Sequence, residues 1–300
     1  MFDSPLSASA YEVLGVAPDV VDDDLRRAYR LRLRETHPDT GGDAAAFIQV
    51  QHAWELIGSP EARRAYDRGH DDGERLQWGG RSDASRTGTR PKTASYGQAG
   101  SWRRERYLAL VREWAEGDVA DPYSPSFVRS TPWALRRLLA DALAEEDTAR
   151  AMEDLGIGFT VWHDVATGPG DETLDHVVLS PTGLYGLVSE DFGGPVGFRR
   201  DEISGPEAGD RMPVRELLSR MRAVARSARV RFGGAIVVLP DDDVVQPVTR
   251  LGVVGRVPVI AVRRSALRTV LRTGVPGARI VGGNELFDVR TRLKQTVRTR

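Results

Sequence analysis

The chain has 300 residues, and its 42 basic and 43 acidic residues give a net charge of −1, which offers no overall preference for nucleic acid or an acidic membrane surface. It contains no cysteine, which excludes disulfides, thiolate metal sites and cysteine nucleophiles, and no apolar run approaches the ~18 residues of a membrane helix. We therefore expect a cytoplasmic protein of about two domains, with no secretory signal and no membrane segment.

Residues 1–70 are predicted to form an all-α domain built on an antiparallel helical hairpin. Three acidic residues at 22–24 favour the start of one long helix, which runs to about Thr36, because carboxylates stabilise the N-terminal end of a helix dipole. After a break at Gly41 and Gly42, residues with one apolar face predict the second long helix. These residues are Phe47, Val50, Trp54 and Ile57. Short helices are expected at 11–14 and 61–67.

The loop between the two long helices contains the tripeptide His37-Pro38-Asp39. A tripeptide alone is a weak signal, but this one lies between helices of the expected kind. The residues that accompany it are Tyr11, Leu14-Gly15-Val16, Ala28-Tyr29-Arg30, Phe47, Ala53-Trp54 and Arg64-Ala65-Tyr66-Asp67. Together they resemble the J-domain of the DnaJ family over about residues 8–69.

The resemblance implies a co-chaperone that stimulates ATP hydrolysis by a 70-kDa heat-shock chaperone of the DnaK class. The positions that it marks for binding this partner are His37, Pro38, Asp39, Tyr29, Arg26 and Arg30, together with Arg27. None of them would catalyse a reaction, because hydrolysis takes place on the partner. Elementary chemistry agrees with a binding role, since proline stiffens the loop and a carboxylate suits an arginine of the partner.

Two alternatives remain open for these residues. Tyr29 is equally a candidate core residue, and Arg30 and Arg34 are candidates for an ordinary solvated face. Arg32 departs from the family pattern, which usually has an apolar residue four positions after the alanine of Ala28-Tyr29-Arg30. We expect the stem of Arg32 to lie along the edge of the core, or the helix to be slightly rotated.

Residues 71–101 are rich in Gly, Ser, Thr, Arg and Asp without apolar periodicity, so we predict a flexible linker. Residues 102–130 are predicted to be a helical connector. From 131 to 300 a long helix, to about Leu155, precedes short apolar runs that alternate with helices, which predicts an α/β domain. The expected strands are 159–165, 176–179, 183–188, 235–239 and 257–262, with helices at 214–230 and 265–273.

A second and weaker resemblance, over about residues 130–265, is to the nuclease-related (NERD) domain, which has a restriction-endonuclease-like fold. It depends on Ala149–Gly156, Val161–Val165, Leu174–Leu179 and Ser180–Val188. Its chemistry would require a metal-binding Asp, for which Asp175 is the match, and then an acid and a lysine two residues apart. Those two positions fall on Val188 and Glu190, so we expect a degenerate domain that binds no metal or cofactor.

The remaining alternatives concern the same region. A surviving metal site would be assembled from Asp175, Glu190, Asp191 and Glu145 or Glu146. His163 and His176 are expected to be hydrogen-bonded core residues rather than ligands. The arginine-rich segment 211–231 and the basic segment 263–300 are candidates for contact with phosphates, although a solvated face is the preferred interpretation.

The sequence thus predicts a non-enzymatic co-chaperone of the miscellaneous J-protein class, since it has neither a Gly/Phe-rich segment nor a cysteine zinc region. Its C-terminal domain would select an unidentified client protein or a location. The alternatives are a metal-dependent nuclease fused to a J-domain and a nucleic-acid-binding adaptor.

Overall fold

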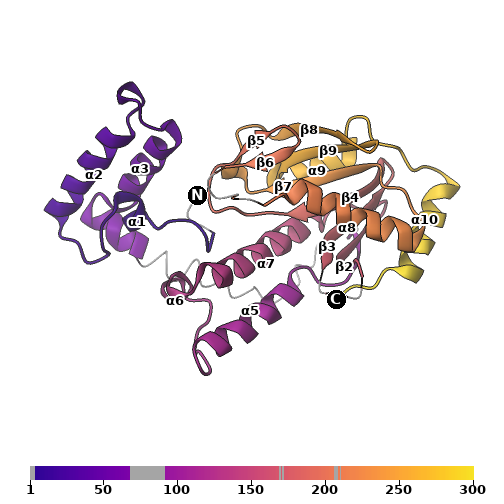
Figure 1. The fold of residues 1–300 in the computed structure, drawn as a ribbon, viewed down its shortest axis with the longest axis horizontal. Helices are drawn as coiled ribbons and strands as arrows, with labels where there is room; N and C mark the ends of the chain where they lie inside the picture. Colours follow the sequence, from indigo (N-terminus) through magenta and orange to yellow (C-terminus); the bar gives the residue numbers. More distant parts are fainter. Residues whose placement is uncertain (1–3, 68–91, 169, 171, 206–208, 210) are drawn as a thin grey trace. The chain divides into compact units, whose positions relative to one another are not determined.

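The computed structural model describes residues 4–67, 92–168, 170, 172–205, 209 and 211–300 (Figure 1). The chain divides into two compact units, one made of residues 1–84 and 118–136 and the other of 85–117 and 137–300. Most of the predicted linker, residues 71–91, lies outside the described residues. In the described part of the chain, no helix combines the length and the apolar character needed to cross a membrane.

The first unit contains the predicted helical hairpin. Its helices are α1 (Ala10–Leu14), α2 (Asp22–Thr36) and α3 (Ala44–Ile57), and residues 60–67 are also helical. Ser9 caps α1 in a reciprocal capping box with Glu12, and Gly15 ends it in the left-handed conformation. The shared core consists of Ala10, Tyr11, Leu14, Leu25, Val50, Ala53 and Ile57.

Arg63 joins the last of these helical segments to the start of the domain. Its Nε donates to the Tyr11 hydroxyl at 3.0 Å, and its two other nitrogens reach the Asp22 carboxylate at 3.2 Å and the Pro18 carbonyl at 2.6 Å. The Tyr11 hydroxyl in turn donates to Asp67 at 2.8 Å. Burial, followed by this hydrogen bond to Asp67, raises the pKa of Tyr11, so the phenol stays protonated and keeps donating at neutral pH.

The first unit also contains α6 (Pro125–Ser130) and the start of α7 (Trp133–Met152), which continues into the second unit. The second unit begins with α5 (Ser101–Trp114) and the strand that precedes it.

A seven-stranded mixed sheet forms the centre of the second unit, in the order β1-β2-β3-β4-β7-β9-β8. Its strands are β1 (Ala94–Tyr96), β2 (Thr160–Ala166), β3 (Thr173–Ser180), β4 (Gly183–Ser189), β7 (Gly234–Leu239), β8 (Val248–Val254) and β9 (Val257–Arg263). Strands β2, β3 and β4 form an antiparallel meander, whereas β4, β7 and β9 run parallel. A separate hairpin pairs β5 (Gly197–Arg199) with β6 (Glu202–Ser204).

Helices cover both faces of this sheet (Figure 1). On one face, α8 (Pro213–Ala228) and α10 (Asn284–Thr296) contribute apolar side chains to the larger core. On the other face, α9 (Arg264–Thr273) and the end of α7 complete a second core. The prediction of a mixed α/β region is thereby confirmed.

The structure differs from the sequence-based expectations at the start of this unit. Residues 94–96, expected in the linker, form β1 and pair in parallel with residues 160–162 of β2. The segment predicted as a separate connector supplies α5, which belongs to the second unit. The three exposed residues of β1 carry no readable alternation, so local patterns did not reveal this strand. The helix α5 was predicted, but its place in the second unit was not, because its partners lie more than 40 residues away in the chain. Helix α10 and strands β5, β6 and β8 were also not predicted.

Candidate functional site

The loop that follows α2 is closed by its own backbone. His37 ends the helix in an extended conformation, and Pro38–Thr40 form a single turn of 3₁₀ helix. The amides of Gly41 and Gly42 donate to the carbonyls of Pro38 and His37, each at 3.0 Å, and Gly41 has φ of 85°. These bonds and the proline ring restrict the backbone before any partner binds.

The His37 and Asp39 side chains of this loop are accessible to solvent. Asp39 is 89% exposed and His37 is 41% exposed. The amide of Asp39 donates to Nδ1 of His37 at 3.2 Å, which leaves the proton of the neutral ring on Nε2. The histidine ring also packs edge-on against Phe47, with 5.0 Å between ring centroids. The structure thus presents an accessible carboxylate beside a histidine that is held from two sides.

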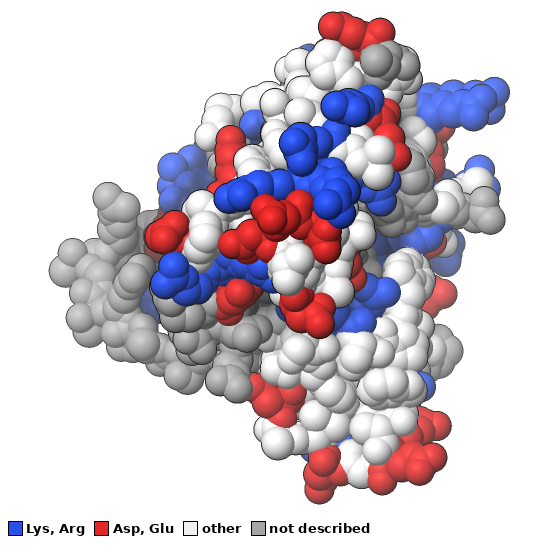
Figure 2. All heavy atoms as spheres, turned by 90° about the vertical axis from the view of Figure 1, so that its left-hand side faces the viewer, with Lys and Arg blue, Asp and Glu red and all other residues white. Residues whose placement is uncertain are grey.

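The arginines predicted to bind the partner, Arg26, Arg27 and Arg30, are all exposed on α2. Arg26 lies 3.5 Å from Asp23, and Arg27 lies 2.6 Å from Asp24. Within the described residues, Arg30 makes no ion pair. On the face drawn in Figure 2, basic side chains gather beside acidic ones. Because exposed pairs are weak, the paired arginines remain available to an acidic partner.

Tyr29 and Arg32 show how α2 sits on α3 and α1. Tyr29 is half-buried and stacks on Trp54, with ring centroids 4.3 Å apart and planes 11° apart. One face of its ring is therefore a packing surface, as the core alternative expected. Arg32 stays exposed, pairs with Glu35 at 3.3 Å and lies against Gly15 at the end of α1. The polar residue at this position is thus accommodated at the surface.

A helical hairpin with an exposed His-Pro-Asp loop defines a J-domain, and comparisons with known proteins agree. Residues 9–67 match the DnaJ domain. DnaJ protein homolog ANJ1 of Atriplex nummularia is 39% identical over 74 residues, which are 25% of this chain and 18% of that protein. Chaperone protein DnaJ 1 of Cutibacterium acnes is 37% identical over 73 residues, 24% of this chain and 19% of that protein.

Chaperone protein DnaJ of Tropheryma whipplei is 48% identical over 59 residues, 19% of this chain and 17% of that protein. The chain therefore contains a DnaJ domain at residues 9–67, as the resemblance predicted. It spans less than a fifth of the length of these curated relatives. The alignments concern the J-domain alone.

The second unit contains a buried charged cluster around Arg103 of α5. The Nη2 atom of Arg103 lies 3.3 Å from Asp175, and Nη1 contacts Glu145 and lies 4.0 Å from Asp164. All three carboxylates are fully buried. Burial raises the pKa of Asp164 to about 6, although the charge of Arg103 works in the opposite direction. The positive charge of one guanidinium therefore faces three buried carboxyl groups.

Glu190 extends this charged cluster. It contacts Arg137 at 2.5 Å and Arg211 at 2.8 Å, and Arg137 also reaches Asp141 at 2.8 Å. Burial and the nearby charge of Asp141 raise the pKa of Glu190 to about 8. The charges of Arg137 and Arg103 oppose this shift. Arg137 and Arg211 hold the Glu190 side chain in place. Asp191, one residue later, accepts instead from the amide of Gly193.

His163 and His176 form a hydrogen-bonded pair, which agrees with the expectation of core histidines. Their Nδ1 atoms are 2.9 Å apart, while His163 Nε2 contacts Ser95 at 2.8 Å and His176 Nε2 contacts Ser189 at 3.2 Å. Burial lowers the pKa of His163 to about 4. Because one ring must donate to the other, the pair shares one hydrogen between the two Nδ1 atoms.

The described residues hold no group of three His, Cys, Asp or Glu placed to bind a metal ion. Of the acids considered for a surviving metal site, Asp175 and Glu145 meet at Arg103, and Glu190 lies with Arg137 and Arg211. Glu146 pairs separately with Arg104. Sequence reasoning did not identify Arg103, Arg137, Asp141 or Asp164, because their partners are distant in the chain or carry no local motif.

Proposed function

We propose that this chain is a co-chaperone that stimulates ATP hydrolysis by a 70-kDa chaperone of the DnaK class. The observation that carries the proposal is the closed loop that presents the carboxylate of Asp39 to solvent beside the arginines of α2. A preformed loop loses little conformational entropy on binding, and exposed arginines steer it toward an acidic surface. The J-domain would act by favouring the hydrolysis-competent state of its partner.

We propose the same docking residues that the resemblance marked. Asp39 would accept hydrogen bonds from an arginine of the chaperone, and Arg30, Arg26 and Arg27 would face its acidic surface. Tyr29 would contribute the ring face that Trp54 leaves uncovered. Pro38 and His37 would position the carboxylate.

The test is single-turnover ATP hydrolysis by the cognate chaperone with and without the full chain. Wild type is expected to accelerate hydrolysis and His37→Gln to lose the acceleration. His52→Gln, the same substitution on α3 away from the loop, is the matched control and should behave as wild type. Equal acceleration by wild type and His37→Gln would refute the proposal.

For the second unit we propose a restriction-endonuclease-like fold without nuclease activity, which serves to select a client or a location. Val188 lies in the apolar core, where it could not bind a metal. The Glu190 carboxylate forms ion pairs with Arg137 and Arg211. The guanidinium of Arg103 lies beside Asp175 and its acidic neighbours. The charge that a divalent cation would neutralise is thereby already compensated by arginines.

Incubation with supercoiled plasmid and Mg²⁺ or Mn²⁺ tests this second proposal, and the plasmid should remain intact. Metal-dependent nicking that Asp175→Asn abolishes would identify a nuclease instead. Duplex DNA binding that weakens steeply with salt would favour the nucleic-acid adaptor.

A further inference from the structure

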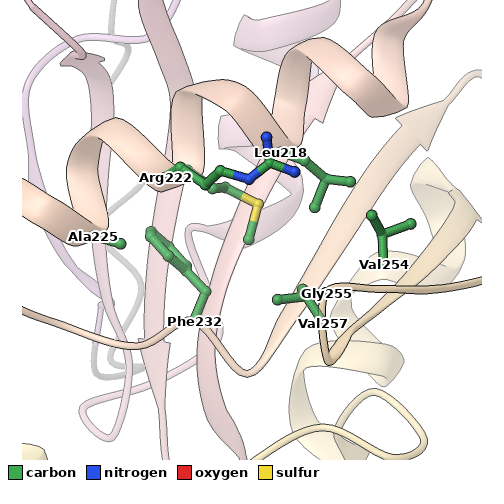
Figure 3. Close-up of a pocket in the computed structure, with 8 residues that line it drawn as sticks. Leu218, Arg222, Ala225, Phe232, Val254, Gly255 and Val257 are labelled. Carbon is green, nitrogen blue, oxygen red and sulfur yellow. The ribbon is translucent and has the colours of Figure 1, made fainter.

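An apolar pocket opens between α8 and the turn that joins β8 to β9 (Figure 3). Its volume is about 140 Å³. Helix α8 contributes Leu218, Met221, Arg222 and Ala225, the turn contributes Val254, Gly255 and Val257, and Phe232 closes the remaining side. Val254, Val257 and Phe232 are half-buried and pack on the larger core, so the pocket is a solvent-accessible gap in that core. An apolar cavity of roughly 150 Å³ accommodates a group the size of benzene.

Arg222 supplies the charge of this pocket. Figure 3 shows its side chain lying along α8 and reaching over the pocket toward Leu218. Arg222 is exposed and, within the described part of the chain, forms no ion pair or hydrogen bond with another side chain. No acidic residue lines the pocket. Its occupant should therefore combine an apolar group with a nearby negative charge.

The turn beside the pocket carries a second cationic side chain, Arg256, at a position with strained backbone. Val254 pairs with Val257 across two central residues, Gly255 with φ of 56° and Arg256 with φ of 75°. Such a turn favours Gly or Asn at both positions, and an arginine in the left-handed region is strained. Arg256 is also exposed. The strained position thus carries a charged side chain on the turn that borders the pocket.

We propose that this pocket binds a bulky apolar side chain of a partner protein segment that has Asp or Glu within two residues of it. The apolar side chain would fill the space between Met221 and Phe232, and the carboxylate would pair with Arg222 or Arg256. This inference rests on the proposed client-selecting role of the second unit and gives that role a binding site. A protein segment is favoured over a nucleic acid because the lining is apolar and contains no aromatic platform beyond one half-buried ring.

Selection from a random-peptide display library on the full chain tests the proposal, followed by fluorescence anisotropy with an enriched peptide. Enriched sequences should carry Leu, Ile, Met or Phe next to an acidic residue. Ala225→Leu fills the pocket with a residue that favours helix, and should weaken binding by about tenfold or more. Arg222→Glu should weaken it by about fivefold or more, since it reverses the charge at the rim.

The matched control is Arg215→Glu, the same charge reversal on an exposed part of α8 outside the pocket, which should leave binding unchanged. Arg256→Asn keeps a residue suited to the turn and should weaken binding without loss of thermal stability. Failure to enrich such peptides, or equal binding by Ala225→Leu and wild type, would overturn the proposal. Binding is measured without the chaperone, so this result is independent of the ATPase test.

Discussion

Arg103 is the residue on which the buried charge of the second unit depends. Its guanidinium contacts Glu145 and Asp175 and lies near Asp164, and none of these carboxylates reaches solvent. Removing one partner of a buried ion pair is costly because the remaining charges are left uncompensated.

Arg103→Ala is therefore expected to lower the free energy of unfolding by about 3–5 kcal/mol, measured by urea denaturation followed by circular dichroism. Arg106→Ala on the exposed face of the same helix should change it by no more than ~0.5 kcal/mol. A loss from Arg103→Ala as small as that of the control would show that the three acids are protonated or solvated.

His163 makes stability depend on pH in a predictable direction. Burial lowers its pKa from 6.5 to about 4. Between pH 6.5 and pH 4 the ring is therefore protonated in the unfolded chain but neutral in the folded protein. The contribution of this residue to the free energy of unfolding should fall by about 3 kcal/mol as pH is lowered from 7 to 4.

The raised pKa values of Asp164 and Glu190 act in the opposite direction, because ionisation of the unfolded carboxyls destabilises the folded state as pH rises. The measurement is therefore the difference in unfolding free energy between wild type and His163→Gln at several pH values. That difference should shift in favour of the variant at acidic pH. A difference that is constant between pH 7 and pH 4 would contradict the assignment.

At the scale of elements, two adjacent glycines close the loop after α2 for different reasons. Gly41 has φ of 85° with open space around it, whereas a Cβ at Gly42 would overlap the backbone of Thr36. The first position requires a left-handed conformation, and the second requires the absence of a side chain.

Gly42→Ala is expected to cost about 1–3 kcal/mol and to displace the His-Pro-Asp turn, because Thr36 belongs to α2 and cannot move freely. Gly41→Ala should cost about 1 kcal/mol from strain alone. Chaperone ATPase stimulation, measured under conditions in which both variants are folded, should therefore fall further for Gly42→Ala. Equal stimulation by the two variants would mean that the turn tolerates displacement.

At the scale of the whole molecule, the two units carry separate proposed tasks. The docking loop belongs to the first unit and the apolar pocket to the second. No side chain is shared between them, so substitutions in one site should not alter intrinsic binding at the other.

His37→Gln should leave binding of the selected peptide unchanged while it abolishes ATPase stimulation. Ala225→Leu should have the opposite pair of effects, with full stimulation and loss of peptide binding. Anisotropy and single-turnover hydrolysis on both variants provide the check. If either substitution affected both assays, the units would act as one functional site.

Local sequence patterns were sufficient for the J-domain. The acidic start of α2, the break at Gly41 and the apolar spacing of α3 are short-range features, and the His-Pro-Asp loop follows directly from where those helices end. The central strands β2, β3, β4, β7 and β9 were also predicted, because each contains a short run rich in apolar residues between turn residues.

The sequence by itself therefore determined the helical hairpin, its exposed loop and the strands at the centre of the sheet. Only the tertiary structure decided that α5 brings Arg103 to Asp175, 72 residues further along the chain, and that β1 pairs with β2. It alone brought α8 to the turn at Gly255 to form the apolar pocket. The periodicity of apolar residues indicates which face of a helix or strand is buried. Ion pairs and cavities depend instead on which other elements, distant in the sequence, pack against that face.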